Sequence, residues 1–272
     1  MSVVADARVS IAGLGAIGRT IAQELDKGGI PGMKLGAVSA RNKQKAQAFV
    51  SILANPVPVV ELAELGDYGD IVVECAPAAL LAEIAEPVLA RQKKLVVLSV
   101  GALLNNPHLK QAAIDGGGTI LVPTGALLGL DAMLAAAEGT IYSVRMITRK
   151  PPNGLLGAPF LIENGINLEG LTEPLKVFTG TAREAAAGFP ANLNVAVALS
   201  LAGVGPDLTI LEIWADPTVT RNTHRIEVDS DSARLTMTIE NIPTDNPKTG
   251  VITARSVIAL LRKMSAPLRV GT

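Results

Sequence analysis

The sequence predicts an α/β protein in which a doubly wound parallel sheet is followed by a second α+β domain with a mixed sheet. Three observations lead to this prediction: strand and helix patterns alternate over the first 125 residues, a glycine-rich turn joins the first strand to the first helix, and later strands alternate polar with apolar residues. Strands that alternate with helices of this length pair in parallel through right-handed crossovers.

The elements of the first domain follow from periodicity. Ile17, Ile21 and Leu25 recur at helical spacing, and Asn106 with Pro107 is typical of a capped helix start. We expect strands at 8–12, 34–39, 70–75, 95–99 and 119–122, with helices at 16–26, 43–53, 78–91 and from 106 to about 116.

The pattern changes after about residue 126. Here His224, Ile226 and Val228 share one face of a strand, and the charged residues between them share the other. Such a one-sided sheet must cover its apolar face with helices or with another subunit. We expect strands near 140–149, 207–215, 223–229 and 233–240, and helices at 130–138, 191–202 and from 246 to about 264.

Composition excludes several classes of protein. The 24 Lys and Arg balance 25 Asp and Glu, which gives no indication of a nucleic-acid or anionic-membrane partner. The hydrophobic content of 49% excludes disorder, and the single cysteine excludes an internal disulfide. Pro190 and two asparagines interrupt the longest charge-free stretch, so it predicts a buried helix, not a membrane span. A soluble cytoplasmic protein is expected, and the widely separated histidines and cysteine predict no metal site.

The first motif with chemical meaning is Gly13-Leu14-Gly15-Ala16-Ile17-Gly18, which leaves a predicted strand and enters a predicted helix. Gly13 permits a tight turn, Gly15 lets the backbone approach a pyrophosphate, and Gly18 lets helix and strand pack closely. The helix N-terminus offers free N–H groups to phosphates. The motif predicts a dinucleotide site with contacts from Gly13, Gly15, Ala16, Ile17 and Gly18; an ordinary glycine-rich turn is the alternative.

The choice of nucleotide is read about 20 residues further on. A site specific for NAD usually has Asp or Glu at the end of the second strand, but residues 37–42 contain no carboxylate. Ser39 and Arg41 suit a 2′-phosphate, Arg41 through charge-assisted hydrogen bonds. We expect that NADP is accepted at least as well as NAD; the alternative is that Arg41 is a solvated residue at a helix start.

Further candidates lie beyond the carboxyl ends of the parallel strands, where ligands bind. Cys75 and Ala76 follow one strand and are expected to line the cofactor crevice. Cys75 is also a candidate nucleophile, as in enzymes that oxidise aldehydes through a thioester, although a small residue lining the crevice is the commoner role.

The chain has two histidines, so a histidine catalyst must be His108 or His224. His108 is expected in the first turn of a surface helix, where a solvated role is the default. His224 is expected on the covered face of its strand, where it is either a satisfied core residue or a catalyst. Trp214 is interpreted most simply as a core residue.

Two helix starts offer polar groups. Lys248 and Thr249, after Asn246-Pro247, present an ammonium, a hydroxyl and N–H groups that suit a carboxylate, although a plain capped helix explains them equally well. Asn192 and Asn194 place two amides at another helix start, where capping accounts for one of them.

These motifs, in their order, resemble the L-aspartate dehydrogenase family. The matching segments are GLGAIG at 13–18, SVGAL at 99–103, PTGALLGLDA at 123–132, FPANLNVAVALSLAG at 189–203, ADPTVTRNTH at 215–224 and NPKTG at 246–250. The resemblance implies a Rossmann domain of residues 1–125 completed by a C-terminal helix at 244–272. It also implies a catalytic domain at 126–243, through which two copies form a homodimer.

The resemblance also implies roles for individual residues. The catalytic histidine of the family falls on His224, its nicotinamide contacts fall on Ala126 and Asn192, and Asn194 is a weaker substrate-side match. We therefore expect NAD(P)-dependent oxidative deamination of L-aspartate to iminoaspartate, then oxaloacetate and ammonia, and the reverse amination. His224 is expected to act as the acid and base, and Lys248 with Thr249 to bind a substrate carboxylate. The imine could also feed pyridine nucleotide biosynthesis.

Three alternatives stay open from the sequence. One is another Rossmann reductase, such as an enzyme like dihydrodipicolinate reductase or a sugar-type oxidoreductase. The second is a thiol-dependent semialdehyde dehydrogenase that uses Cys75. The third is a non-catalytic NAD(P)-sensing protein, which would bind nucleotide without turning over any amino or oxo acid.

Overall fold

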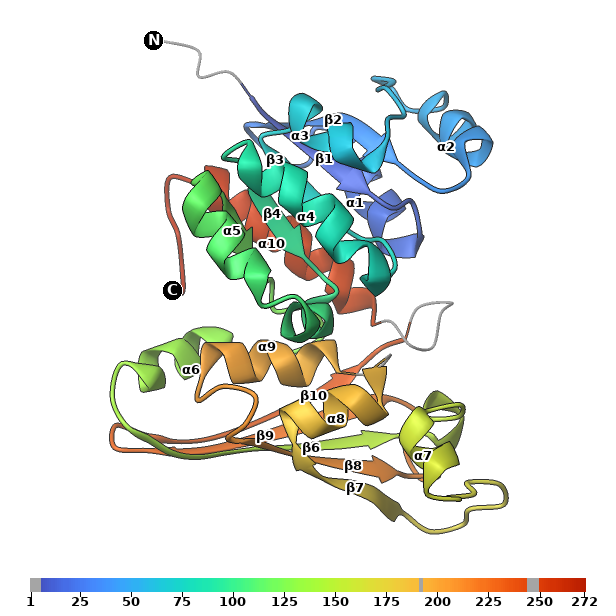
Figure 1. The fold of residues 1–272 in the computed structure, drawn as a ribbon, viewed down its shortest axis with the longest axis vertical. Coiled ribbons are helices and arrows are strands. Elements are labelled where there is room, and N and C mark those ends of the chain that lie inside the picture. Colours follow the sequence, from blue (N-terminus) through green and yellow to red (C-terminus); the bar gives the residue numbers. More distant parts are fainter. Residues whose placement is uncertain (1–5, 191–192, 244–249) are drawn as a thin grey trace. The chain divides into compact units, whose positions relative to one another are not determined.

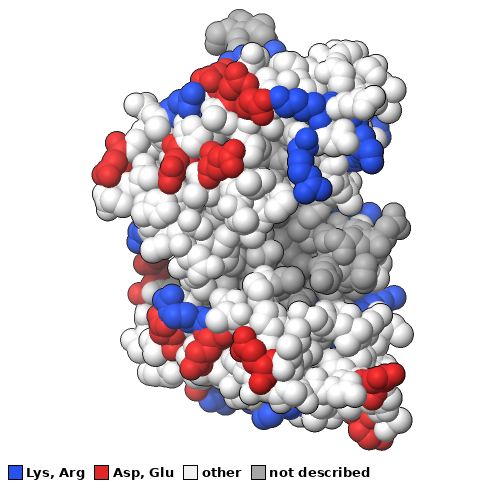
Figure 2. Space-filling view, turned by 45° about the vertical axis from the view of Figure 1, so that its right-hand side comes forward, with Lys and Arg blue, Asp and Glu red and all other residues white. Residues whose placement is uncertain are grey.

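The computed structural model describes residues 6–190, 193–243 and 250–272. The chain divides into two compact units: Met1–Pro123 with Ala254–Val270, and Thr124–Thr253 with Gly271–Thr272. No helix in the described part of the chain combines the length and apolar character needed to cross a bilayer. On the face shown in Figure 2, positive and negative side chains are interspersed with large uncharged areas.

The first unit is built on a parallel sheet in the order β2-β1-β3-β4-β5 (Figure 1). Its strands are β1 (Ala7–Ala12), β2 (Met33–Ser39), β3 (Ile71–Glu74), β4 (Lys94–Val97) and β5 (Thr119–Leu121). The helices are α1 (Ala16–Asp26), α2 (Lys43–Val50), α3 (Leu65–Tyr68), α4 (Leu81–Ala90), α5 (His108–Gly116) and α10 (Val251–Ser265). The predicted doubly wound sheet is confirmed.

Strand order reverses at β1, which has β2 on one side and β3 on the other. Beyond β2, Val38 forms a parallel bridge with Val59, with hydrogen bonds from Val38 N to Pro58 O and from Val60 N to Val38 O. This short contact continues the sheet in the order of a Rossmann fold. Ligands of such folds bind outside the carboxyl ends of the strands at the reversal, where the glycine motif leaves β1.

The C-terminal helix completes the core of this unit. Val257 and Leu261 of α10 are fully buried and pack with Ile11 of β1 and Ile21 of α1. The side chain of Arg262 also forms an ion pair of 2.6 Å with Glu24. A second apolar cluster, which includes residues of α4 and α5, contains the other set of side chains from the same strands. Helices therefore cover the sheet on both faces.

The second unit contains a mixed sheet in the order β10-β9-β6-β8-β7. Strands β6 and β8 pair in parallel, and the other neighbours are antiparallel. The strands are β6 (Ile141–Lys150), β7 (Leu175–Thr181), β8 (Thr209–Ala215), β9 (Asn222–Ser230) and β10 (Arg234–Asn241). The helices are α6 (Leu130–Ala137), α7 (Pro159–Glu163), α8 (Ala182–Gly188) and α9 (Asn194–Ala202).

The alternation predicted for β9 is confirmed. His224, Ile226 and Val228 are 3%, 0% and 2% exposed, whereas Arg225 between them is exposed. Figure 1 shows helices α6, α8 and α9 along one face of this sheet. We call the face with His224 the covered face and the opposite face, with Arg225, the outer face. Helices of the same chain therefore cover the apolar side.

Several elements differ from the sequence prediction. Strand β7 and helices α7 and α8 were not predicted; α8 begins with a capping box in which Thr181 and Glu184 exchange hydrogen bonds, and Phe178 of β7 packs edge-on against Phe160 of α7. The predicted Asn106 cap is wrong, because its Nδ2 donates to Ala102 O and the helix cap is Pro107.

Candidate functional site

The glycine loop of the first unit is shaped by backbone packing. Gly13 has a φ of +101°, and a Cβ at this position would lie 2.6 Å from the carbonyl oxygen of Cys75. At Gly18, a Cβ would collide with the carbonyl oxygen of Gly13, so both positions require glycine. By contrast, no protein atom lies within 4 Å of a Cβ built on Gly15. Gly15 is the N-cap of α1 and offers no side-chain cap, so this open side suits a pyrophosphate on the helix N-terminus.

Arg41 lies close in the chain to the residue that holds the glycine loop. Gly13 N donates to Ser39 O over 2.7 Å, which ties the loop to the end of β2. Ser39 is buried, whereas Arg41 two residues on is exposed. The end of the second strand is where the ribose of a dinucleotide is recognised in such folds, and Arg41 is exposed two residues after that end.

Glu74, a residue that sequence reasoning missed, ends β3 with a fully buried carboxylate. Its Oε1 accepts hydrogen bonds from Ala76 N and Ser99 Oγ, both over 3.0 Å, and its Oε2 accepts from Leu98 N at 3.1 Å and Ser99 N at 2.8 Å. Burial raises the pKa of Glu74, and these four hydrogen bonds act in the opposite direction. The carboxylate fixes the ends of β3 and β4 beside the glycine loop.

Cys75 follows Glu74 as a neutral thiol, half-buried against the apolar cluster that contains Ile11 and Ile21. Burial, and secondarily the charge of Glu74, raise its pKa well above the ordinary value for cysteine. A thiol nucleophile needs a lowered pKa, so its environment disfavours the thioester alternative. Ala76 follows it, half-buried, with its N–H bound to Glu74.

His224 is the third residue of β9 and lies on the covered face of the second unit. It is paired with Thr148 of β6 on one side and Ile239 of β10 on the other. Its Nδ1 lies 3.1 Å from the hydroxyl oxygen of Thr148, a hydrogen bond that orients the ring. Burial, with a smaller effect from the charge of Lys150, lowers the pKa of His224 to about 3. The imidazole is therefore neutral at neutral pH.

Lys150 was also missed by sequence reasoning. It follows Thr148 by two residues on β6, so it belongs to the same covered face, and it is 5% exposed. Val144, Met146 and Thr148 precede it with the same alternation of buried positions. That alternation is the signal that could have revealed a lysine pointing toward the covered side.

The turn that contains Ala126 is held by β10. Leu127 N donates to Thr124 O over 3.0 Å, and Gly125 has a φ of +62°. Asn241, the last residue of β10 and 4% exposed, donates from Nδ2 to Ala126 O over 3.0 Å. The predicted nicotinamide contact Ala126 is thus tied to a strand that pairs with the strand of His224.

The other predicted residues are placed as follows. Asn194 is exposed at the first position of α9. His108 is exposed on α5, with Nε2 3.1 Å from Glu86 Oε1, which fits the solvated role. Asn192, Lys248 and Thr249 lie outside the described residues. The predicted site residues are divided between the two units. The second unit contains Ala126, Asn194 and His224, and the first contains Gly13, Gly15, Ala16, Ile17, Gly18, Arg41, Cys75 and Ala76.

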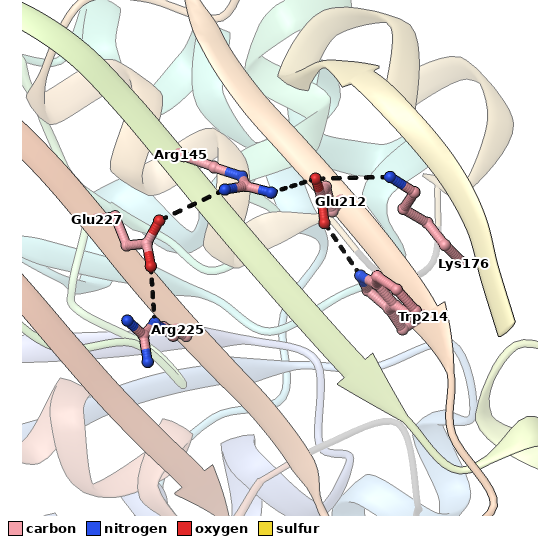
Figure 3. Close-up of polar contacts among 6 residues, drawn as sticks. All are labelled: Arg145, Lys176, Glu212, Trp214, Arg225 and Glu227. Carbon is pink, nitrogen blue, oxygen red and sulfur yellow. Dashed lines mark hydrogen bonds and ion pairs between the residues drawn. The ribbon is translucent and has the colours of Figure 1, made fainter. Parts of the chain in front are cut away.

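Trp214 is not the core residue that the sequence suggested. It lies half-buried on the outer face, where its Nε1 donates to Glu212 Oε2 over 3.1 Å (Figure 3). The guanidinium of Arg149 lies 4.8 Å from the ring centroid, a cation–π contact. The hydrogen bond to Glu212 and the cation–π contact with Arg149 therefore stabilise the Trp214 ring on this polar face.

The low pKa of His224 predicts a dependence of stability on pH. Its folded-state pKa is about 3, below the unfolded value of 6.5, so its contribution is complete above pH 6.5 and is lost as the pH falls. Between about pH 5.5 and 4.5 we expect His224 to reduce the free energy of unfolding by about 1.4 kcal/mol for each unit by which the pH falls.

Urea unfolding followed by the fluorescence of Trp214, the single tryptophan, measures this slope. His224→Gln should remove it, and the exposed control His108→Gln should retain it. An equal slope in wild type and His224→Gln would show that the buried imidazole is not responsible.

Comparison with known proteins gives the family of the chain. Residues 131–264 match the family model for the C-terminal part of aspartate dehydrogenase, and residues 13–123 match that for the NAD binding domain of homoserine dehydrogenase. L-aspartate dehydrogenase 3 of Bordetella bronchiseptica is 62% identical over 264 residues, 97% of each chain. L-aspartate dehydrogenase of Bradyrhizobium diazoefficiens is 62% identical over 97% of this chain and 94% of its own length.

Solved structures show the same fold. Aspartate dehydrogenase from Thermotoga maritima has a TM-score of 0.72 at 23% identity, covering 97% of this chain and 99% of its own. Scyllo-inositol dehydrogenase from Lactobacillus casei, solved with NAD(H) and scyllo-inositol, has a TM-score of 0.53 at 13% identity, with 94% and 87% covered. Taken with the relatives of 62% identity, the chain belongs to the L-aspartate dehydrogenase family.

Proposed function

We propose that this chain catalyses the NAD(P)-dependent oxidative deamination of L-aspartate, and the reverse amination of oxaloacetate. The family relationship gives the substrate class. The observation that supports the chemistry most directly is the buried imidazole of His224, which is neutral and oriented by Thr148. A neutral imidazole with a fixed ring is the form that accepts a proton.

The first unit fits a nicotinamide dinucleotide. Its glycine loop leaves open space at Gly15, and the free N–H groups of α1 face that space. When bound, the nucleotide supplies the hydride acceptor for oxidation and the hydride donor for reduction. Its phosphates would be held by the glycine loop, and its ribose end by Arg41. Cys75 and Ala76 would line the wall of the cofactor site, and the nicotinamide would contact Ala126 and Asn192. The residues of the glycine loop that we expect to contact the phosphates are Gly13, Gly15, Ala16, Ile17 and Gly18.

The role of His224 follows from the electron balance of the reaction. The amino nitrogen needs a free lone pair to form the C=N bond as the Cα–H bond breaks, so the substrate ammonium must first lose a proton. His224 takes that proton, and it returns one in the reductive direction. Water then adds to the carbon of iminoaspartate, and ammonia leaves to give oxaloacetate. Lys248 and Thr249 are the sequence-predicted partners of one substrate carboxylate, and Asn194 is a weaker candidate on the substrate side.

The pKa of about 3 belongs to the protein without substrate. A dicarboxylate beside His224 adds negative charge, which offsets the charge of Lys150 and favours the imidazolium. We therefore propose that substrate binding raises the pKa of His224 toward the range in which it can accept a proton.

The direct test is absorbance at 340 nm with purified protein, oxaloacetate and ammonium, run separately with NADH and NADPH. We expect nucleotide oxidation that requires both oxaloacetate and ammonium. His224→Ala should lower kcat by roughly 10²- to 10⁴-fold, the usual value of positioned proton transfer, while nucleotide binding is retained. Nucleotide binding without turnover would favour the sensing alternative, and an unchanged kcat in the variant would remove His224 from the mechanism.

Because Arg41 follows β2 in a segment without a carboxylate, we expect NADP to be used at least as well as NAD. Arg41→Ala removes a charge-assisted partner of the 2′-phosphate, so we expect kcat/KM for NADP to fall roughly 10-fold or more, with little change for NAD. The exposed Arg255→Ala serves as the control for loss of a positive charge in the same unit. Equal losses with the two nucleotides would show that Arg41 does not choose between them.

We further propose a homodimer formed through the outer face. Glu212, with its side chain 8% exposed, accepts from Arg145 at 2.5 Å and lies 3.8 Å from Lys176, while Glu227 lies 3.7 Å from Arg145 and 2.8 Å from Arg225 (Figure 3). Opposite charges in one row suit a two-fold contact, in which the same patch meets itself.

Apolar surface supports the same assignment. Ile210, 38% exposed, lies on this face beside a hollow of about 510 Å³. Sedimentation velocity should give twice the chain mass of 28.1 kDa. Ile210→Asp should shift the protein toward monomer, and Ile52→Asp, at a 78% exposed site of the first unit, should not. A wild-type monomer at micromolar concentration would contradict the proposal.

The proposal extends to the localisation of the enzyme and to the fate of its product. We expect a cytoplasmic enzyme whose imine product either hydrolyses or leaves for quinolinate synthesis, within pyridine nucleotide biosynthesis. These two fates are separated by measuring the amount of oxaloacetate formed per nucleotide reduced in the presence of a quinolinate-forming enzyme. Equal amounts indicate hydrolysis of the imine, and less oxaloacetate than reduced nucleotide indicates that the imine is consumed for quinolinate.

A further inference from the structure

Three strands bring a second polar row next to His224. Strand β9 lies between β6 and β10, so Thr148, His224 and Ile239 form one cross-strand row on the covered face. Two residues further along, the same face carries Lys150 on β6 and the paired Asn222 and Asn241 on β9 and β10. Residues two apart on a strand are separated by about 7 Å, so the two rows are neighbours.

Lys150 brings a positive charge to this row. Its side chain is 5% exposed, so water screens its charge less than that of a surface lysine. This charge also acts on the imidazole of His224. A substrate carboxylate beside His224 would be attracted by the same charge, since L-aspartate carries two carboxylates and the proposed reaction takes place beside His224.

Asn241 brings an acceptor. Its Nδ2 is used by Ala126 O, but its Oδ1 is buried and has no hydrogen-bond partner among the described residues. A buried acceptor left in this state is costly, and buried polar groups normally have partners. A ligand that donates a hydrogen bond would satisfy it. The ammonium of L-aspartate is such a donor, and it is the group from which His224 is proposed to take a proton.

We infer that this row recognises the substrate: Lys150 binds a carboxylate of L-aspartate, and Asn241 Oδ1 accepts a hydrogen bond from its amino group. The inference rests on the proposed function and adds two residues to it. Asn241 has a second effect, because the same side chain holds Ala126, the predicted nicotinamide contact. Substrate and cofactor contacts would then share one amide.

Succinate separates the two roles, because it has both carboxylates but no amine. For Lys150→Met we expect the KM for L-aspartate and the inhibition constant for succinate to rise together, each roughly 10- to 100-fold, as a charged hydrogen bond is lost. For Asn241→Ala we expect the KM for L-aspartate to rise roughly 10-fold, while the succinate constant changes less than about twofold. Lys110→Met, at an exposed site of α5, is the matched control for loss of charge.

Nucleotide affinity and the melting temperature are measured for each variant. Nucleotide affinity should stay close to wild type in Lys150→Met, whereas both quantities should fall in Asn241→Ala, which also loses the buried hydrogen bond to Ala126 O. If Lys150→Met does not fold, Lys150→Arg carries the test, because a planar guanidinium cannot reproduce the contacts of an ammonium. We then expect the succinate constant to change more than about threefold. An unchanged constant in a folded variant overturns the role of Lys150, and a parallel rise for both ligands in Asn241→Ala overturns that of Asn241.

The outcomes also separate this inference from the proposed function. If wild-type protein oxidises L-aspartate but succinate binding does not depend on Lys150, the inference is wrong and the function stands. If succinate binds through Lys150 but L-aspartate is not oxidised, the row is a dicarboxylate site and the proposed function is wrong.

Discussion

Burial of one imidazole on the covered face of a mixed sheet is the constraint on which the rest of the second unit depends. Removal from water favours the neutral form of His224, and the Thr148 hydroxyl orients it. The polar row of Lys150 and Asn241 lies on the same face, two residues along from His224. The proposed recognition of the substrate charges and the proposed proton transfer would therefore take place on neighbouring rows of three paired strands.

The first unit meets a different requirement, which is close approach of backbone to a phosphate. Gly13 and Gly18 leave no room for a side chain, and Gly15 leaves an open space. Glu74 makes the surrounding loops rigid, because one buried carboxylate accepts four hydrogen bonds from residues after β3 and β4. The ends of β3 and β4 beside the glycine loop are therefore held together by hydrogen bonds of the protein itself.

Much of the fold and part of the candidate site could be predicted from the sequence. The alternation of polar and apolar residues around His224 predicted which face of the sheet carries it, and the glycine motif predicted the turn between β1 and α1. Both predictions succeeded because each pattern is local in sequence. Glu74 and Lys150 were missed because a charged residue at the end of a buried strand has meaning only once its cross-strand neighbours are known. Strand β7 was missed for a similar reason, since Phe178 packs against Phe160, which is distant in sequence. The position of Trp214 was predicted wrongly because the two cations over its ring, Arg149 and Lys176, lie on the neighbouring strands β6 and β7.

The most direct test of the buried, neutral imidazole is an NMR titration of its ring carbon, with the His224 signal assigned by its loss in His224→Asn. With two histidines in the chain, the spectrum is simple. We expect the signal of His224 to stay at the neutral position from pH 8 down to about 5, because burial holds its pKa near 3. A titration midpoint near 6.5, the ordinary value for histidine, would show an imidazole open to water and contradict the account.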